Sequence, residues 1–114
     1  MLLIGLGGGA LAGWLLSHLT DLEELVACEV DPVVARVARE FFMRGTAHDP
    51  RLTIHEGDGL EYARKAGSTF DAVLVDASES AGSREKGSDQ GVWAPPRALR
   101  LVRASRGLSV HVLR

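Results

Sequence analysis

The fold is decided by one stretch near the start of the chain, Leu2-Leu3-Ile4-Gly5-Leu6-Gly7-Gly8-Gly9-Ala10. Its first three residues are apolar and predict a short buried strand, and four of the next five residues are glycines. Apolar residues then recur at helical spacing as far as Leu19. A strand, a glycine turn and a helix bring backbone N–H groups and a helix N-terminus close to a nucleotide-like ligand. Taken alone, this signal is weak, because glycine clusters also end strands for purely structural reasons.

The bulk composition predicts one small globular domain. The chain has 114 residues, of which 46% are hydrophobic and 25% charged, and we expect residues 1–114 to form a single, partial domain. The net charge of −2 favours neither a nucleic-acid nor a membrane partner. The single cysteine, Cys28, is expected in a buried strand, which fits a reducing compartment, and we expect a cytoplasmic protein.

Further apolar runs predict strands that alternate with helices. The strands are expected at residues 25–30, 52–55, 70–76 and 108–113, the helices at 32–42, 60–66 and 95–105, and a polar loop at 77–94. Asp31 is expected to cap the helix that begins at Pro32. The apolar side of that helix is expected to carry Val33, Val34, Val37, Phe41 and Phe42.

This alternation predicts an α/β fold with a Rossmann-like parallel sheet and helices on both faces. We expect the strand order 3-2-1-4-5, which lacks the last two strands usual for such a domain. Ligands of open α/β sheets bind outside the carboxyl ends of the strands, beside the point where the strand order reverses. The glycine turn, Glu29, Asp58 and Asp76 would all meet at that edge.

Three carboxylates at that edge suggest specific chemistry. Glu29 lies at the end of the second strand, where an acid can accept hydrogen bonds from both hydroxyls of a ribose; the alternative is a capping or surface carboxylate. Asp58 can accept from an exocyclic amine such as that of adenine, or can simply form a turn. Asp76 ends the fourth strand and is the best candidate to face the reacting groups, unless it only caps the loop that follows.

A dinucleotide site is an alternative. The spacing Gly5-x-Gly7-x-x-Ala10 satisfies the Rossmann fingerprint, and Glu29 lies where NAD enzymes keep an acid. The rest of the pattern argues against it, namely Glu29-Val30-Asp31-Pro32, Gly57-Asp58-Gly59 and the run from Phe70-Asp71 to Val75-Asp76.

Four segments carry a specific resemblance. They read IGLGGGALAGWL (4–15), ACEVDPVVARVAREFF (27–42), DPRLTIHEGDGLEYARKAG (49–67) and FDAVLVDAS (70–78). They resemble motifs of the class I S-adenosylmethionine-dependent methyltransferases, in the branch related to spermidine synthase. Within this branch they are most similar to the methyltransferase-like protein thirteen family, which methylates a lysine and the N-terminus of elongation factor 1-alpha. The resemblance implies S-adenosyl-L-methionine as cofactor and a protein amine as acceptor, such as one on a translation elongation factor.

The resemblance also assigns site residues. Gly5, Gly7 and Gly9 would lie against the methionine and ribose parts of the cofactor. Glu29 would bind the ribose with Val30 beside the adenine, Asp58 and Gly59 would contact the adenine edge, and Asp76 would lie near the methionine amino group and orient or deprotonate the acceptor amine.

Departures from the pattern keep other functions open. Leu3 stands where many class I enzymes have an acid, and the sequence stops after the fifth expected strand, so we expect the cofactor half of a domain that lacks activity alone. One alternative is a non-catalytic cofactor-binding fragment or scaffold. Another is a polyamine aminopropyltransferase, which needs an acid-rich site, and Asp76-Ala77-Ser78-Glu79 keeps only part of that pattern. The histidines lack metal-ligand spacing, so no metal is expected.

Overall fold

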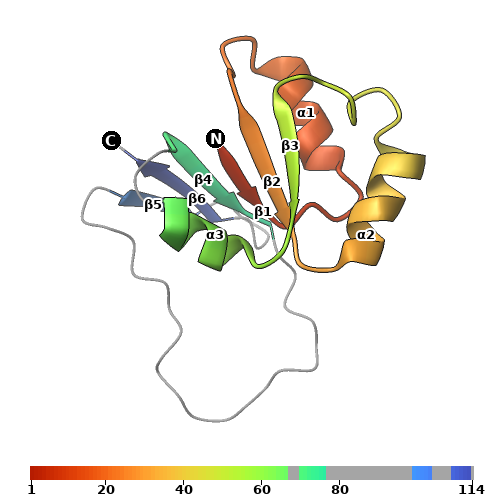
Figure 1. Cartoon of the computed structure of the whole chain (residues 1–114). Coiled ribbons are helices and arrows are strands. Elements are labelled where there is room, and N and C mark those ends of the chain that lie inside the picture. Colours follow the sequence, from red (N-terminus) through yellow and green to blue (C-terminus); the bar gives the residue numbers. More distant parts are fainter. Residues whose placement is uncertain (67–69, 77–98, 104–108, 114) are drawn as a thin grey trace.

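The computed structural model describes residues 1–66, 70–76, 99–103 and 109–113, which form a six-stranded sheet in the order β3-β2-β1-β4-β6-β5 (Figure 1). The strands are β1 (Leu2–Ile4), β2 (Leu25–Glu29), β3 (Leu52–Glu56), β4 (Ala72–Val75), β5 (Leu99–Arg103) and β6 (Ser109–Leu113). The helices are α1 (Ala10–His18), α2 (Pro32–Val37), the π-helix η1 (Ala38–Phe42) and α3 (Gly59–Ala66). Within these ranges, no helix has the length and apolar character needed to cross a membrane.

The four strands β1 to β4 are parallel, as predicted, and they stand in the predicted order 3-2-1-4. Ile4 pairs with Cys28 on one side and with Val75 on the other, and Glu29 pairs with Glu56. The carboxyl ends of these strands therefore meet along one edge of the sheet, where α/β folds bind ligands.

The C-terminal part of the prediction was wrong in two respects. Residues 99–103 form β5, where a helix over 95–105 was expected, and β6 pairs antiparallel with both β4 and β5. The arginines at three-residue intervals favoured a helix, but Leu99-Arg100-Leu101 also alternates as a strand does. Pairing with β6 decides between the two, because an antiparallel partner needs no crossover helix. The rest of the expected helix and the loop 77–94 lie outside the described residues.

Two buried clusters lie on opposite faces of the parallel strands. On one face, Leu3 and Ala27 pack with residues of α1 and η1, and on the other, Ile4 and Cys28 pack with Ala63 of α3. Adjacent residues of a strand thus point into different clusters, which is why β1 and β2 are apolar almost throughout. Figure 1 shows α1 and α2 on one side of the sheet and α3 on the other.

The segment 32–42 differs from the single helix predicted. Val33, Phe41 and Phe42, expected on the buried side, are 55%, 59% and 69% exposed. The residues buried instead are Ala35 and Ala38. Two alanines bring the helix backbone close to the sheet, and that leaves no room beneath it for the larger side chains. Asp31 caps α2 as predicted, because its Oδ1 accepts from the N–H of Val33 at 2.8 Å.

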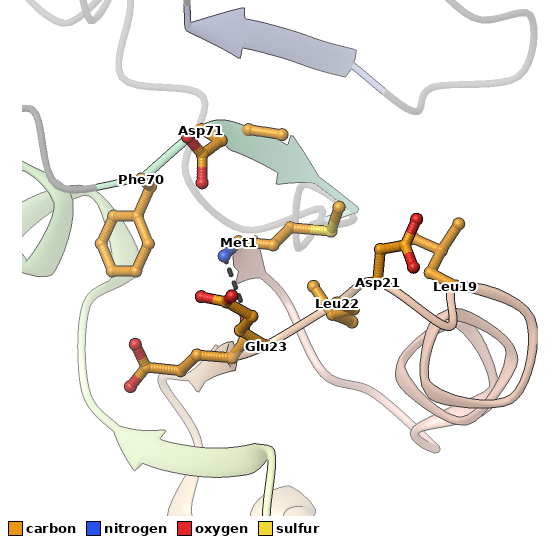
Figure 2. A pocket seen from close by; sticks show the side chains of 9 residues that line it. Met1, Leu19, Asp21, Leu22, Glu23, Phe70 and Asp71 are labelled. Carbon is orange, nitrogen blue, oxygen red and sulfur yellow. Dashed lines mark hydrogen bonds between the residues drawn. The ribbon is translucent and has the colours of Figure 1, made fainter.

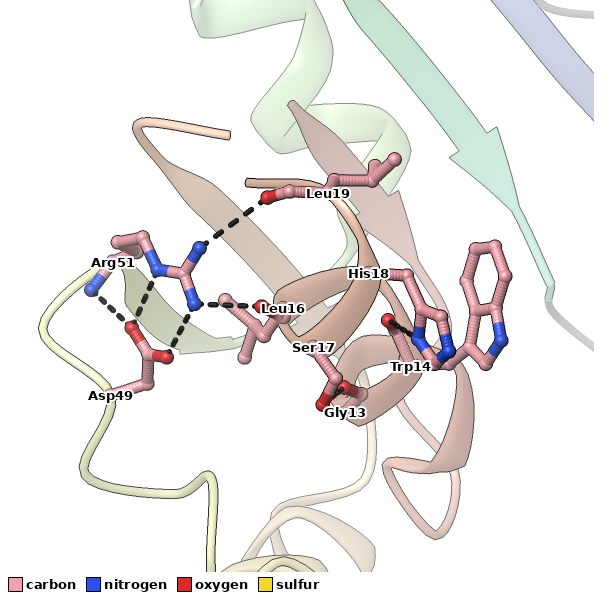
Figure 3. A network of polar contacts seen from close by, with 8 residues as sticks. All are labelled: Gly13, Trp14, Leu16, Ser17, His18, Leu19, Asp49 and Arg51. Carbon is pink, nitrogen blue, oxygen red and sulfur yellow. Dashed lines mark hydrogen bonds and ion pairs between the residues drawn. The ribbon is translucent and has the colours of Figure 1, made fainter. Parts of the chain in front are cut away.

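The C-terminal end of α1 is fixed by Arg51, which no sequence pattern predicted (Figure 3). Its guanidinium donates to the carbonyl oxygens of Leu16 at 2.7 Å and Leu19 at 3.4 Å. Asp49 holds that guanidinium with hydrogen bonds of 3.0 and 2.8 Å. The last carbonyls of a helix lack partners within it and carry partial negative charge, so a cation here stabilises the helix end.

Candidate functional site

A cavity of about 590 Å³ lies at the carboxyl edge of β1, β2 and β4. Of the eight positions predicted to bind the cofactor, all but Gly9 line it. The predicted residues that do so are Gly5, Gly7, Glu29, Val30, Asp58, Gly59 and Asp76. The topology therefore brings residues from four separate loops to one place. Their ligand contacts stay predictions.

Glu29 ties the glycine turn to the end of β2. Its Oε2 accepts from the backbone N–H groups of Leu6 at 3.2 Å and Gly7 at 3.1 Å, and its Oε1 accepts from that of Asp31 at 3.1 Å. Three donors fix the carboxylate at the rim of the cavity before any ligand arrives. A carboxylate oxygen has two acceptor sites, so Oε2 is already satisfied by two N–H groups, and Oε1 can still accept from one ligand hydroxyl.

Val30 has the character expected of a residue that covers an apolar ring. It is 73% exposed although its side chain is apolar, and it lines the cavity together with Val34 of α2 and Leu60 of α3. Ile4 contributes a further apolar surface from β1. These side chains form the apolar part of the cavity, and most of the polar side chains that line it are carboxylates.

Asp58 serves the fold as well as the cavity. Its Oδ1 accepts from the N–H groups of Leu60 at 2.8 Å and Glu61 at 3.1 Å and so caps α3. The turn-forming role considered for Asp58 is therefore present in the structure. Both bonds use Oδ1, which leaves Oδ2 able to accept from a ligand amine.

The glycines of the site differ in what they do. Gly7 has φ +53°, and a Cβ there would meet nothing within 4 Å, so this backbone is open to a ligand. Gly59 is a packing position instead, because a Cβ would lie 2.7 Å from Cγ2 of Ile4 and 3.1 Å from Cβ of Cys28. Gly9 lies outside the cavity lining and faces Met43.

Asp76 follows β4 directly and reaches the cavity from the side opposite to Glu29. Its backbone N–H donates to the carbonyl oxygen of Ile4 at 2.8 Å, which continues the β1–β4 ladder by one residue. Its side chain is exposed and lines the cavity. This position at the reversal of strand order is the one expected for a group that faces the reacting atoms.

The cavity lining is acidic. Its carboxylates are Glu29, Asp31, Asp58 and Asp76, and no lysine, arginine or histidine is among the described residues that line it. Burial, and then the negative charge of Asp58, raise the pKa of the Cys28 thiol to about 11, so this thiol is uncharged at neutral pH. The electrostatic field of the lining therefore favours a cationic ligand.

A second cavity, of about 430 Å³, lies near the opposite ends of the strands (Figure 2). Its lining includes Asp21, Glu23, Glu24 and Asp71, and the amino group of Met1 donates to the carbonyl oxygen of Glu24 at 2.8 Å. Burial lowers the pKa of that amino group. None of the predicted site residues lies there, and within the described ranges no group of three or more His, Cys, Asp or Glu side chains could hold a metal ion.

Comparison with known proteins identifies the family. Residues 1–91 match the spermine/spermidine synthase domain. The chain belongs to this family. Similar proteins include spermidine synthase 1 of Hyoscyamus niger, 35% identical over 89 residues, which are 75% of this chain and 28% of that relative. Polyamine aminopropyltransferase of Leptospira biflexa is 33% identical over 87 residues, or 75% of this chain and 31% of that relative.

Solved structures agree with this assignment to the spermine/spermidine synthase family. A spermidine synthase in complex with the transition state analogue AdoDATO has a TM-score of 0.59 and 35% identity, over 67% of this chain and 27% of that one. Spermidine synthase from Thermotoga maritima has a TM-score of 0.61 and 33% identity, over 69% of this chain and 28% of that one. The chain thus spans less than a third of the length of these relatives.

The family assignment corrects the function predicted from the sequence. Methyl transfer to a protein amine was wrong, because the relatives are spermidine synthases and polyamine aminopropyltransferases. The Rossmann-like fold and the relation to spermidine synthase are confirmed, whereas no comparison supports a special closeness to the methyltransferase-like protein thirteen family. The aminopropyltransferase alternative was ranked too low because Asp76-Ala77-Ser78-Glu79 keeps only part of the expected acid-rich pattern.

Proposed function

We propose that this chain provides the donor-binding part of a polyamine aminopropyltransferase, with decarboxylated S-adenosylmethionine as donor. The observation that carries the proposal is the cavity at the carboxyl edge, whose titratable side chains among the described residues are four carboxylates and a neutral thiol. Membership of the spermine/spermidine synthase family supports the same reaction class.

The nucleoside of the donor matches the apolar and hydrogen-bonding parts of the cavity. Glu29 is placed to accept from a ribose hydroxyl, since its carboxylate is held at the cavity rim by backbone N–H groups and Oε1 has one acceptor site left. Val30 offers an exposed apolar surface for one face of the adenine. Oδ2 of Asp58 can accept from the exocyclic amine of the same base.

The charge of the cavity distinguishes the two donors. Decarboxylated S-adenosylmethionine carries a sulfonium and an ammonium group and no carboxylate, so each of its charges is attracted by the lining. Intact S-adenosylmethionine adds a carboxylate, for which the described lining has no lysine, arginine or histidine. A carboxylate placed among like charges without a cation is strongly disfavoured.

The reaction itself is a displacement at carbon. The lone pair of an uncharged acceptor amine attacks the aminopropyl carbon bonded to sulfur, and a C–N bond forms as the C–S bond breaks. The C–S electrons neutralise the sulfonium and release methylthioadenosine, and the new ammonium loses one proton. We assign Asp76 to this end of the cavity, where its carboxylate would bind the ammonium of the donor or orient the acceptor amine. Such catalysis depends mainly on positioning.

Titration calorimetry on the purified 114-residue chain tests the proposal. We expect decarboxylated S-adenosylmethionine to bind at least about tenfold more tightly than S-adenosylmethionine, the ratio that one unfavourable charge contact of about 1.4 kcal/mol produces. Equal affinity, tighter binding of S-adenosylmethionine, or binding of neither compound would contradict the proposal.

A turnover assay extends the test to catalysis. The chain is incubated with decarboxylated S-adenosylmethionine and 1,4-diaminobutane, and spermidine is measured by mass spectrometry. If Asp76→Asn abolishes spermidine formation and lowers the affinity for the donor by a smaller factor than the turnover rate, the role assigned to Asp76 is supported. Unchanged turnover in that variant removes Asp76 from the reaction. Donor binding without any spermidine would limit this chain to donor binding.

A further inference from the structure

The glycine turn is held at both of its ends. On the strand side, the N–H groups of Leu6 and Gly7 donate to Oε2 of Glu29. On the helix side, the N–H of Gly9 donates to the carbonyl of Leu6 at 2.9 Å, and its own carbonyl accepts the first helical bond of α1 from Gly13 at 2.9 Å. The position of Gly9 therefore sets where the turn lies relative to Glu29.

Met43 fixes that position. Its side chain is 2% exposed and lies directly on Gly9, where a Cβ would come 2.2 Å from Sδ and 2.3 Å from Cγ of Met43. Gly9 also has φ +77°, a conformation that other residues rarely adopt. The contact therefore leaves no room for any side chain at position 9.

The π-helix η1 aims Met43 at the turn. The N–H of Met43 donates to the carbonyl of Ala38 at 2.8 Å, five residues back, and its carbonyl accepts from Thr46 at 2.9 Å and Ala47 at 2.7 Å. A π turn contains one residue more than an α turn, and one residue corresponds to about 100° around a helix. In a regular α-helix Met43 would thus point elsewhere, and its backbone is fixed from both sides.

We propose that Met43 is a positioning residue of the donor site, which acts through Gly9 and the glycine turn on Glu29. This inference rests on the proposed function for the identity of the ligand. Met43 is absent from the cavity lining, whereas Gly7 and Glu29 line it, so the effect on the ligand passes through the turn. Without the Met43 side chain, Gly9 loses the surface on which it packs. The N–H groups of Leu6 and Gly7, which donate to Glu29, are then no longer held in position.

Three variants separate this role from simple core filling. Met43→Ala removes the contact, Met43→Leu retains a side chain of similar volume, and Leu25→Ala makes a cavity in the same buried cluster at the far end of β2. The dissociation constant for methylthioadenosine is measured at a temperature at which circular dichroism shows each variant folded. We expect a rise of about tenfold for Met43→Ala, the effect of losing one hydrogen bond to a charged group. Met43→Leu and Leu25→Ala should stay close to the wild type, and an equal rise in Leu25→Ala would overturn the proposal.

A second measurement needs no ligand. In a two-dimensional nitrogen–proton NMR spectrum, the amide signals of Leu6 and Gly7 should shift in Met43→Ala and stay in place in Leu25→Ala. Gly9→Ala should lower the urea midpoint of unfolding less in the Met43→Ala background than in the wild type, because the clash with Sδ is gone. Equal losses in both backgrounds, or unmoved amide signals, would refute the positioning role. If the wild type binds no nucleoside, the proposed function fails. The two ligand-free measurements still show whether Met43 holds the glycine turn in place.

Discussion

Replacing Glu29 by glutamine tests the most specific feature of the donor site. The wild-type carboxylate accepts three backbone N–H groups, two at Oε2 and one at Oε1. Glutamine keeps the length of the side chain but replaces one acceptor oxygen by an NH₂ group, which can only donate. Because Leu6 and Gly7 both donate to the same atom, the amide oxygen should turn toward them, which leaves the NH₂ group facing the N–H of Asp31.

The loss in donor affinity follows from this geometry. A ribose hydroxyl can donate to the free acceptor site on Oε1 of Glu29, but in the variant the NH₂ group takes the place of Oε1 and cannot accept. The variant therefore loses one hydrogen bond to a charged group, which contributes about 1.5–3 kcal/mol. That energy corresponds to a dissociation constant raised by roughly 10- to 150-fold.

Titration calorimetry with methylthioadenosine and its 2′-deoxy analogue measures this loss. The matched control is Glu40→Gln, which changes an exposed glutamate of η1 outside the cavity. The 2′-deoxy analogue should bind the wild type more weakly than methylthioadenosine does, and the difference should shrink in Glu29→Gln. Wild-type affinity in Glu29→Gln, or an undiminished effect of the 2′-hydroxyl, would refute ribose binding by Glu29.

Two further predictions concern stability. The hydrogen bonds from Arg51 lower the pKa of Asp49 to about 2 from a usual 3.8, so the pair stabilises the fold above pH 4 and loses this contribution as the pH falls toward 2. Urea midpoints between pH 2 and 5 should therefore depend less on pH in Asp49→Asn, and an unchanged dependence would contradict this role. Gly59→Ala places a methyl group 2.7 Å from Ile4, and overpacking of about 1–3 kcal/mol should outweigh the gain of up to about 1 kcal/mol in helix propensity. Urea unfolding should show a net loss for Gly59→Ala and a change within about 0.5 kcal/mol for the open position in Gly45→Ala.

The parallel half of the fold was predictable because its signals are local and agree with one another. Leu2-Leu3-Ile4 can only be a short buried strand before a glycine turn, and Asp31-Pro32 can hardly be anything but a helix start. The segment 99–103 lacks such agreement. Its apolar residues fit either the period of a helix or that of a strand. Only pairing with β6, a contact between residues that are separated in the sequence, makes this segment a strand.

The sequence predicted which residues line the cavity better than it predicted what each of these residues does. Topology alone brings Glu29, Asp58 and Asp76 to one edge, and the structure places them there. The capping bonds of Asp58 and the packing of Gly9 on Met43 depend on side-chain positions that no spacing encodes. Met43 itself carries no sequence signal, because its burial follows from the π turn before it.

The error about the transferred group has a physical reason. Three of the four segments that carried the resemblance lie at the glycine turn, Glu29 and Asp58, the part of the site predicted to bind a nucleoside, and they would serve any donor built on one. A methyl donor and an aminopropyl donor differ at the other end, in a single carboxylate. The property that separates them in the structure is thus the charge of the described lining, which the glycine turn, Glu29 and Asp58 do not report by themselves. Four carboxylates without a lysine, arginine or histidine in the described lining favour the donor that lacks the carboxylate. Charge summed over the described lining is therefore the structural feature on which the proposed aminopropyl transfer rests.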